Sequence, residues 1–187
     1  MKPQFPHAYV LNVLTDDHPG IVAAITRAVN QRGGNIDACS QTVVEGYFTL
    51  IMVISFAKPV EPDALAAEIR GDTATGFQVV ARPFIAPAAK SPAAIDRFVL
   101  TAFGKDKPGI VRRFSEYLAG KDINILDLFA HREGDDFLLI GQLEIPAARD
   151  LALLQADLEQ IAAEEAFTVK LQHENIFVAT NQLRLEH

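Results

Sequence analysis

The chain has 187 residues, of which 49% are hydrophobic, and its formal net charge is −7 at pH 7. That acidic balance argues against non-specific nucleic-acid binding, because such binding needs lysine and arginine to neutralise phosphates. It argues equally against an anionic membrane surface. No apolar run reaches the ~18 residues of a membrane span, the N-terminus has no signal-peptide apolar region, and the single cysteine, Cys39, cannot form an internal disulfide. We therefore expect a cytoplasmic protein.

The first half of the chain combines the two main apolar periodicities. Alternating apolar residues predict strands, and apolar residues recurring at helical spacing predict helices. In chain order they predict a strand at 8–15, a helix from Ile21 that stops at Gly33, strands at 35–44 and 47–56 joined by a turn at Glu45-Gly46, a helix at 63–70 and a strand at 77–85. This βαββαβ order is a ferredoxin-like unit.

The second half repeats the same order. It predicts a strand at 97–103, a helix at 110–120, strands at 124–132 and 137–145, a helix at 148–163 and a strand at 167–172. Small residues and two prolines between the halves predict a fairly extended linker. We expect a first domain at 1–86, a linker at 87–95 and a second domain with a C-terminal extension at 96–187. In that extension, the apolar residues of 175–183 suggest an added strand or a clasp on the other domain.

The predicted fold class is therefore α+β, with two ferredoxin-like βαββαβ modules. Each module has an antiparallel sheet with its helices on one face. Residues 8–15 are apolar on both alternating faces, which predicts cover on both sides of the sheet. The second cover would be the other module or a second chain.

One strand–turn–helix junction occurs in both modules. The first copy spans residues 16–22 and the second spans 105–111, so Asp17 corresponds to Asp106 at an offset of 89 residues. An Asn-Ile pair follows each copy at the same distance. Proline at position 19 has the fixed φ that suits a first helical turn.

The chemistry of this junction suits an amino-acid zwitterion. The first N–H groups of a helix lack intrahelical partners and carry partial positive charge, so they accept a carboxylate. An aspartate before the helix accepts an ammonium group, and an asparagine amide offers a donor and an acceptor. The candidate ligand-binding residues are Asp17, Gly20, Ile21 and Asn35 in the first module and Asp106, Gly109, Ile110 and Asn124 in the second.

From the residue pattern alone, structural roles are the more common explanation of the same residues. An aspartate just before a helix is a common N-cap, worth about 1 kcal/mol, and an asparagine after two glycines is common in turns. Other chemistry has little support. The histidines lack metal-ligand spacing, and the sequence has neither a nucleophile elbow nor a glycine-rich phosphate loop. We expect no catalytic residues, metal or cofactor.

The repeated motif resembles the ACT domain family. Residues 17–22 followed by 34–36 match its pattern, as do 106–111 with 124–125, and together the two copies cover about residues 7–173. The resemblance implies regulatory modules that bind amino acids where two modules meet, with ligand contacts from the loop and from the asparagine. A tandem without an attached enzyme is most similar to the glycine cleavage system transcriptional repressor group.

The resemblance implies a non-enzymatic regulator that binds a small amino acid at interfaces between modules. We expect it to form a homodimer, to act through a protein partner without contacting nucleic acid or membrane, and to regulate amino-acid or one-carbon metabolism. Two alternatives stay open. One is an interaction module without a ligand, and the other is an enzyme that uses the acidic loops.

Overall fold

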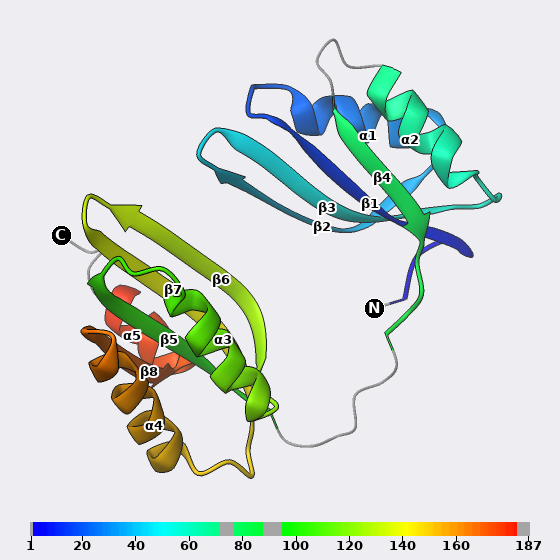
Figure 1. Cartoon of the computed structure of the whole chain (residues 1–187). Coiled ribbons are helices and arrows are strands. Elements are labelled where there is room, and N and C mark those ends of the chain that lie inside the picture. The colour runs from blue at the N-terminus through cyan, green and yellow to red at the C-terminus, as the bar shows by residue number, and fades with distance from the viewer. Residues whose placement is uncertain (1, 72–76, 88–94, 183–187) are drawn as a thin grey trace. The chain divides into compact units, whose positions relative to one another are not determined.

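The computed structural model describes residues 2–71, 77–87 and 95–182 and divides into two compact units (Figure 1). The first unit is Met1–Ala89 and the second is Lys90–His187. Of the predicted linker at 87–95, residues 88–94 lie outside the described residues, and Ile95 already belongs to a strand.

The first unit has six elements, in the predicted order. They are β1 (His7–Asp16), α1 (Ile21–Gln31), β2 (Asn35–Val44), β3 (Tyr47–Phe56), α2 (Pro62–Gly71) and β4 (Gln78–Pro83). The strands form one antiparallel sheet in the order β2-β3-β1-β4. Strand β3 lies between β1 and β2 and pairs with both. Its register with β1 runs from His7 opposite Phe56 to Asp16 opposite Tyr47.

The core of the first unit lies between the sheet and its two helices. Every second residue of β3 is buried, from Phe48 to Phe56, as the pleat of a half-buried strand requires. The helices contribute apolar residues at helical spacing, which are Ile21, Ile25, Ala28 and Val29 from α1 and Leu65, Ala66 and Ile69 from α2.

The second unit repeats this architecture and adds one helix. Its elements are β5 (Ile95–Lys105), α3 (Ile110–Gly120), β6 (Asn124–Glu133), β7 (Asp136–Pro146), α4 (Leu151–Glu164), β8 (Phe167–His173) and α5 (Glu174–Gln182). The sheet order is β6-β7-β5-β8, which matches the first sheet strand for strand. The prediction of two ferredoxin-like βαββαβ modules is confirmed.

The predicted strand at 175–183 is wrong, because its described residues form helix α5. Glu174, Phe177 and Val178 are spaced i, i+3 and i+4, so they share one helix face, and together with Val99 and Ile140 they line a groove. Val99 lies next to a core-facing residue of β5, so α5 covers the sheet face away from α3 and α4. It contacts β5 and β8 of its own unit.

Among the residues that the structure describes, no helix is long and apolar enough to cross a membrane.

Candidate functional site

The repeated junction places a glycine at the start of each following helix. Gly20 caps α1 with φ 97° and Gly109 caps α3 with φ 96°, both left-handed conformations that favour glycine. The carbonyl of Gly20 accepts the first helical bond, from Ala24 N at 2.9 Å. The expectation that Pro19 lies in the first helical turn is wrong. Helix α1 begins at Ile21 with Gly20 as its N-cap, so Pro19 lies in the turn that precedes the helix.

The aspartates of the junction do not cap these helices. Neither the α1 N-cap nor the α3 N-cap has a side-chain hydrogen bond, so the alternative capping role is wrong for Asp17 and Asp106. Their backbones hold the loop to the neighbouring hairpin instead. Asp17 N donates to Gly46 O at 2.8 Å, and Asp106 N donates to Asp135 O at 2.8 Å. Each carboxylate therefore stays at the exposed tip of its module.

The asparagines lie at the other end of the sheet. Asn35 opens β2 opposite Ser55, whereas the loop of Asp17 follows the end of β1, opposite Tyr47. At ~3.3 Å per strand residue, about 26 Å of strand separates the two ends. Within one module, the predicted aspartate and asparagine therefore do not come together. Gly20 and Ile21, by contrast, adjoin the aspartate loop.

Both asparagine amides are hydrogen-bonded inside their own module. Asn35 Nδ2 donates to Asp37 Oδ1 at 2.9 Å. Asn124 Nδ2 donates to Glu144 Oε2 at 3.2 Å. Within the described part of the chain, neither side-chain oxygen has a hydrogen-bond partner, so each can accept a hydrogen bond.

In the second module, a cation faces the loop aspartate. Arg132 Nε lies 3.4 Å from Asp106 Oδ2, and Lys105 Nζ lies 2.7 Å from Asp136 Oδ1 in the neighbouring strand pair. The hydrogen bond and charge of Asp136 raise the pKa of Lys105, so this lysine stays protonated. Asp106 thus has a cationic partner within its own module.

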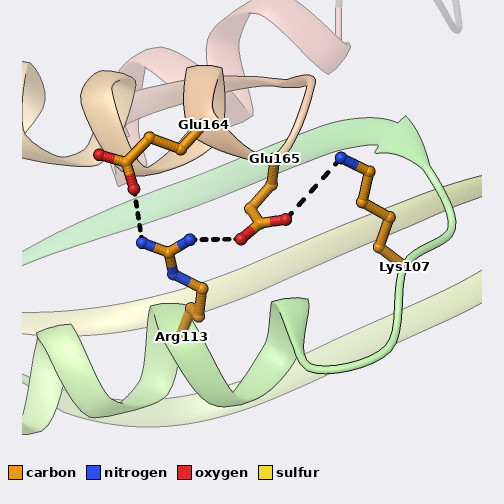
Figure 2. Close-up of polar contacts among 4 residues, drawn as sticks. All are labelled: Lys107, Arg113, Glu164 and Glu165. Atoms are coloured by element: carbon orange, nitrogen blue, oxygen red, sulfur yellow. Dashed lines mark hydrogen bonds and ion pairs between the residues drawn. The ribbon is translucent and has the colours of Figure 1, made fainter.

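A second set of ion pairs ties the same loop to the end of α4 (Figure 2). Arg113 of α3 binds Glu165 through Nη1 and Glu164 through Nη2, the latter at 2.6 Å. Lys107 of the loop lies 3.8 Å from Glu165. Carboxylates at a helix C-terminus oppose its dipole, so these cations offset an unfavourable placement. Hydrogen bonds to Glu165 and Glu164 raise the pKa of Arg113.

The first module lacks these cations around its loop. Ala24 stands at the position of Arg113, and Val43 stands at the position of Arg132. Among the residues that the structure describes, the Asp17 carboxylate has neither an ion pair nor a hydrogen bond. Beside it, His18 Nδ1 lies 3.1 Å from Pro19 O, and the His18 ring lies 6.1 Å from that of Phe77.

A groove of about 540 Å³ lies between α1 and the start of β2. Its polar residues are Thr26, Arg27, Asn30 and Asn35. Within the described ranges, Arg27 has no ion pair. The sequence argument missed this groove, although three of these polar residues recur at helical spacing along α1.

The described residues contain no group of three histidine, cysteine or acidic side chains that could hold a metal ion.

Comparison with known proteins gives one family. The model of the ACT domain matches residues 7–79 and again residues 96–172. A UPF0237 protein of Methanococcus maripaludis is 34% identical over 84 residues, which are 44% of this chain and 93% of the relative. The glycine cleavage system transcriptional repressor of Escherichia coli is 26% identical over 165 residues, which are 84% of this chain and 85% of the relative.

Solved structures show the same fold. A protein from Galdieria sulphuraria has a TM-score of 0.72 at 22% identity, with 89% of this chain and 98% of that chain covered. A proposed glycine cleavage system transcriptional repressor has a TM-score of 0.64 at 19% identity, with 89% and 96% covered.

Proposed function

Because the chain belongs to the ACT-domain family of regulatory modules, we propose that it is a non-enzymatic regulator that binds a small amino acid through the Asp17 loop. The loop offers a helix N-terminus for the ligand carboxylate and an exposed carboxylate for its ammonium group. The contributing residues are Asp17, Gly20 and Ile21.

One observation carries this proposal. The Asp17 carboxylate has no partner among the described residues, whereas Asp106 faces Arg132 at 3.4 Å. An ammonium group would gain the full charge of Asp17 but would have to displace Arg132 from Asp106. The loop of Asp106, Gly109 and Ile110 is accordingly the weaker of the two sites.

The ligand also needs a second module. Since Asn35 and Asn124 lie at the far end of their own sheets, an asparagine can reach the ligand only from a module other than the one that supplies the loop. That module would come from this chain or from a second copy. If the module comes from a second copy, the ligand would help to hold a homodimer together, and it would shift that equilibrium only by its differential affinity for the two arrangements.

The regulatory role rests on the relatives. Similarity to a glycine cleavage system transcriptional repressor supports a role in amino-acid or one-carbon metabolism. The net charge of −7 favours action through a protein partner over direct DNA contact.

Thermal unfolding in the presence of each of the twenty amino acids tests the proposal. A ligand at about 100 times its dissociation constant adds about 2.7 kcal/mol to the free energy of unfolding. We expect one small amino acid to raise the melting temperature, and the Asp17→Asn variant to lose that rise. No shift with any amino acid at millimolar concentration would contradict the proposal.

A ligand-free interaction module is the second candidate, and the bare face of the first sheet favours it. Leu14, Ile51 and Val80 are 39%, 48% and 65% exposed there. Sedimentation of the full chain without added amino acid separates the two functions. A dimer whose stability no amino acid changes would support the interaction module.

A further inference from the structure

Asp37 occupies an unusual position at the start of β2. The register of β2 against β3 shifts between Ile36 and Ala38, so Asp37 is the extra residue of a β-bulge. Bulges often re-aim a side chain, and this one brings the carboxylate to the N-terminal segment of the chain. Gln4 N donates to Asp37 Oδ1 at 2.9 Å.

Residues 4–6, which we call the strap, cross the end of the sheet beside this carboxylate. Phe5 N donates to Ser55 Oγ at 3.1 Å. Ser55 alternates with the core residues Ile54 and Phe56, so its side chain faces away from the helices, yet it is 0% exposed. Ile51, on the same face farther along β3, is 48% exposed. The strap therefore accounts for the burial of Ser55.

The hydrogen bonds of Asp37 leave one of its oxygens without a partner. Asn35 Nδ2 and Gln4 N both donate to Oδ1, each at 2.9 Å. Oδ2 is buried and has no hydrogen-bond partner in the described chain. Burial raises the pKa of Asp37, but the neighbouring Ser55 hydroxyl and the hydrogen bonds from Gln4 and Asn35 outweigh burial and lower it. The group is thus a half-buried carboxylate that no described cation pairs.

The fold itself does not require an acid here. The second module has the same bulge between Ile125 and Asp127, and there the extra residue is Leu126. Its side chain is 41% exposed, and strands β6 and β7 pair as β2 and β3 do. The negative charge therefore serves something other than the formation of the bulge.

We propose that Asp37 is a binding site for a primary ammonium group, which the strap closes by donating backbone N–H groups to Asp37 and Ser55. An ammonium group has three donors and a positive charge. It would satisfy Asp37 Oδ2, replace Gln4 N on Oδ1 and pair the charge of the carboxylate. Asn35 joins this site to the groove along α1, where Arg27 and Asn30 offer donors to a carboxylate.

Within the first module, the site is separate from the Asp17 loop, since the two lie at opposite ends of the sheet. Strap and ligand compete for the same carboxylate, so the affinity is reduced by the fraction of molecules in which the strap is closed. Weakening the strap should strengthen binding.

A proline in the strap tests this competition. Gln4→Pro removes the N–H donor to Asp37, and Gln4→Ala is the matched control because it keeps that donor. Two-dimensional NMR of the Asn35 side-chain amide follows the titration of the full chain with methylammonium chloride. Tetramethylammonium chloride is the matched salt, since it has the same charge but no N–H donor.

We expect methylammonium to bind Gln4→Pro about tenfold more tightly than Gln4→Ala, the effect of one charge-assisted hydrogen bond lost from the closed state. Adding Asp37→Asn to Gln4→Pro should abolish the saturable change in the NMR chemical shift of the Asn35 amide. Adding Asp17→Asn instead should leave that change as it is in Gln4→Pro. Glycine that binds more tightly than methylammonium would identify an amino acid as the ligand, and weaker glycine binding would identify a simple amine.

Equal shifts with tetramethylammonium would overturn the proposal, as would binding that survives Asp37→Asn. If Gln4→Pro does not fold, Phe5→Pro removes the donor to Ser55 and makes the same prediction. A failure here leaves the Asp17 site untouched, because the Asp17→Asn variant reports on that site separately.

Discussion

The loops before α1 and α3 follow the same backbone path but have different charged surroundings. Gly20 and Gly109 have φ values of 97° and 96°, and each loop donates one 2.8 Å hydrogen bond to its hairpin. In the second module, Arg132 and Arg113 lie among acids at the loop and at the end of α4. Duplication has thus preserved the backbone of the junction, while its electrostatics have diverged.

The two cores differ in a similar way. Met52 and Gly141 hold equivalent positions in the sheets, because Met52 pairs with Leu11 and Gly141 pairs with Leu100, the matching residue of β5. Met52 is 1% exposed in the first core. Beside Gly141 lies a void of about 10 Å³ lined by apolar side chains such as Leu128. The Met52 side chain fills this position in the first module, whereas Gly141 leaves it empty in the second.

The largest expected effect comes from removing Met52. Met52→Ala should destabilise the first module by about 2–5 kcal/mol, since it deletes buried atoms and leaves a cavity. Residue-resolved hydrogen exchange measures the two modules separately. Faster exchange is expected in β1 and β3, with β5 and β7 unchanged. Equal loss in both modules would show that they unfold as one unit.

The next largest effect concerns Asp37. Asp37→Asn should destabilise the first module by about 1 kcal/mol at neutral pH, because it weakens charge-assisted hydrogen bonds to Gln4 and Asn35. The folded pKa of Asp37 lies below its ordinary value of 3.8, so this stabilisation is present above that value and disappears as the pH falls through the folded pKa. Thermal unfolding of both proteins between neutral and strongly acidic pH measures it. A difference that stays constant in acid would contradict the assignment.

Filling the pocket beside Gly141 in the second core should increase stability, whereas the two preceding substitutions reduce it. A Cβ added at Gly141 would meet Leu128 Cδ1 at 3.6 Å, an ordinary contact distance. Gly141→Ala should therefore stabilise the second module by roughly 0.5–1 kcal/mol, since glycine weakens a strand interior. Urea unfolding measures the change. A loss of stability would mean that the void is needed for packing.

The smallest effect is expected from the ion pairs of α3. Arg113→Ala should lower the melting temperature slightly at low salt, because half-exposed pairs contribute little and are screened. Arg112→Ala is the matched control, since Arg112 is on the same helix and, among the described residues, has one ion pair, with Glu116 at 3.5 Å. The difference between the two variants should vanish in about 1 M salt. A difference that persists there would point to packing of the Arg113 stem.

The sequence predicted the fold well because its signals are local. Apolar periodicity placed α1 to α4 and the eight strands. Helix α5 was missed because its run of Ile176, Phe177 and Val178 is apolar at every position, and three adjacent apolar residues fit either period. The start of α4 was predicted three residues early, at 148, because the signal of its cap was not used: Asp150 accepts from Ala152 N and Leu153 N.

The site was harder to predict because it depends on long-range placement. The sequence indicated the residue types of the loop, but it did not indicate that Asn35 lies a sheet length from Asp17. Nor could it show that Arg132 faces Asp106, since these residues are brought together only by the pairing of three strands. Asp37 gave no signal, because its role comes from a bulge and from a distant N-terminal segment.

The most direct measurement of the central claim is isothermal titration of the full chain and two matched variants, Asp17→Asn and Asp106→Asn, with the amino acid that gives the largest thermal shift. The account predicts that Asp17→Asn abolishes binding and that Asp106→Asn, whose carboxylate already faces Arg132, binds like the unaltered chain. Loss of binding in Asp106→Asn with full binding in Asp17→Asn would contradict it.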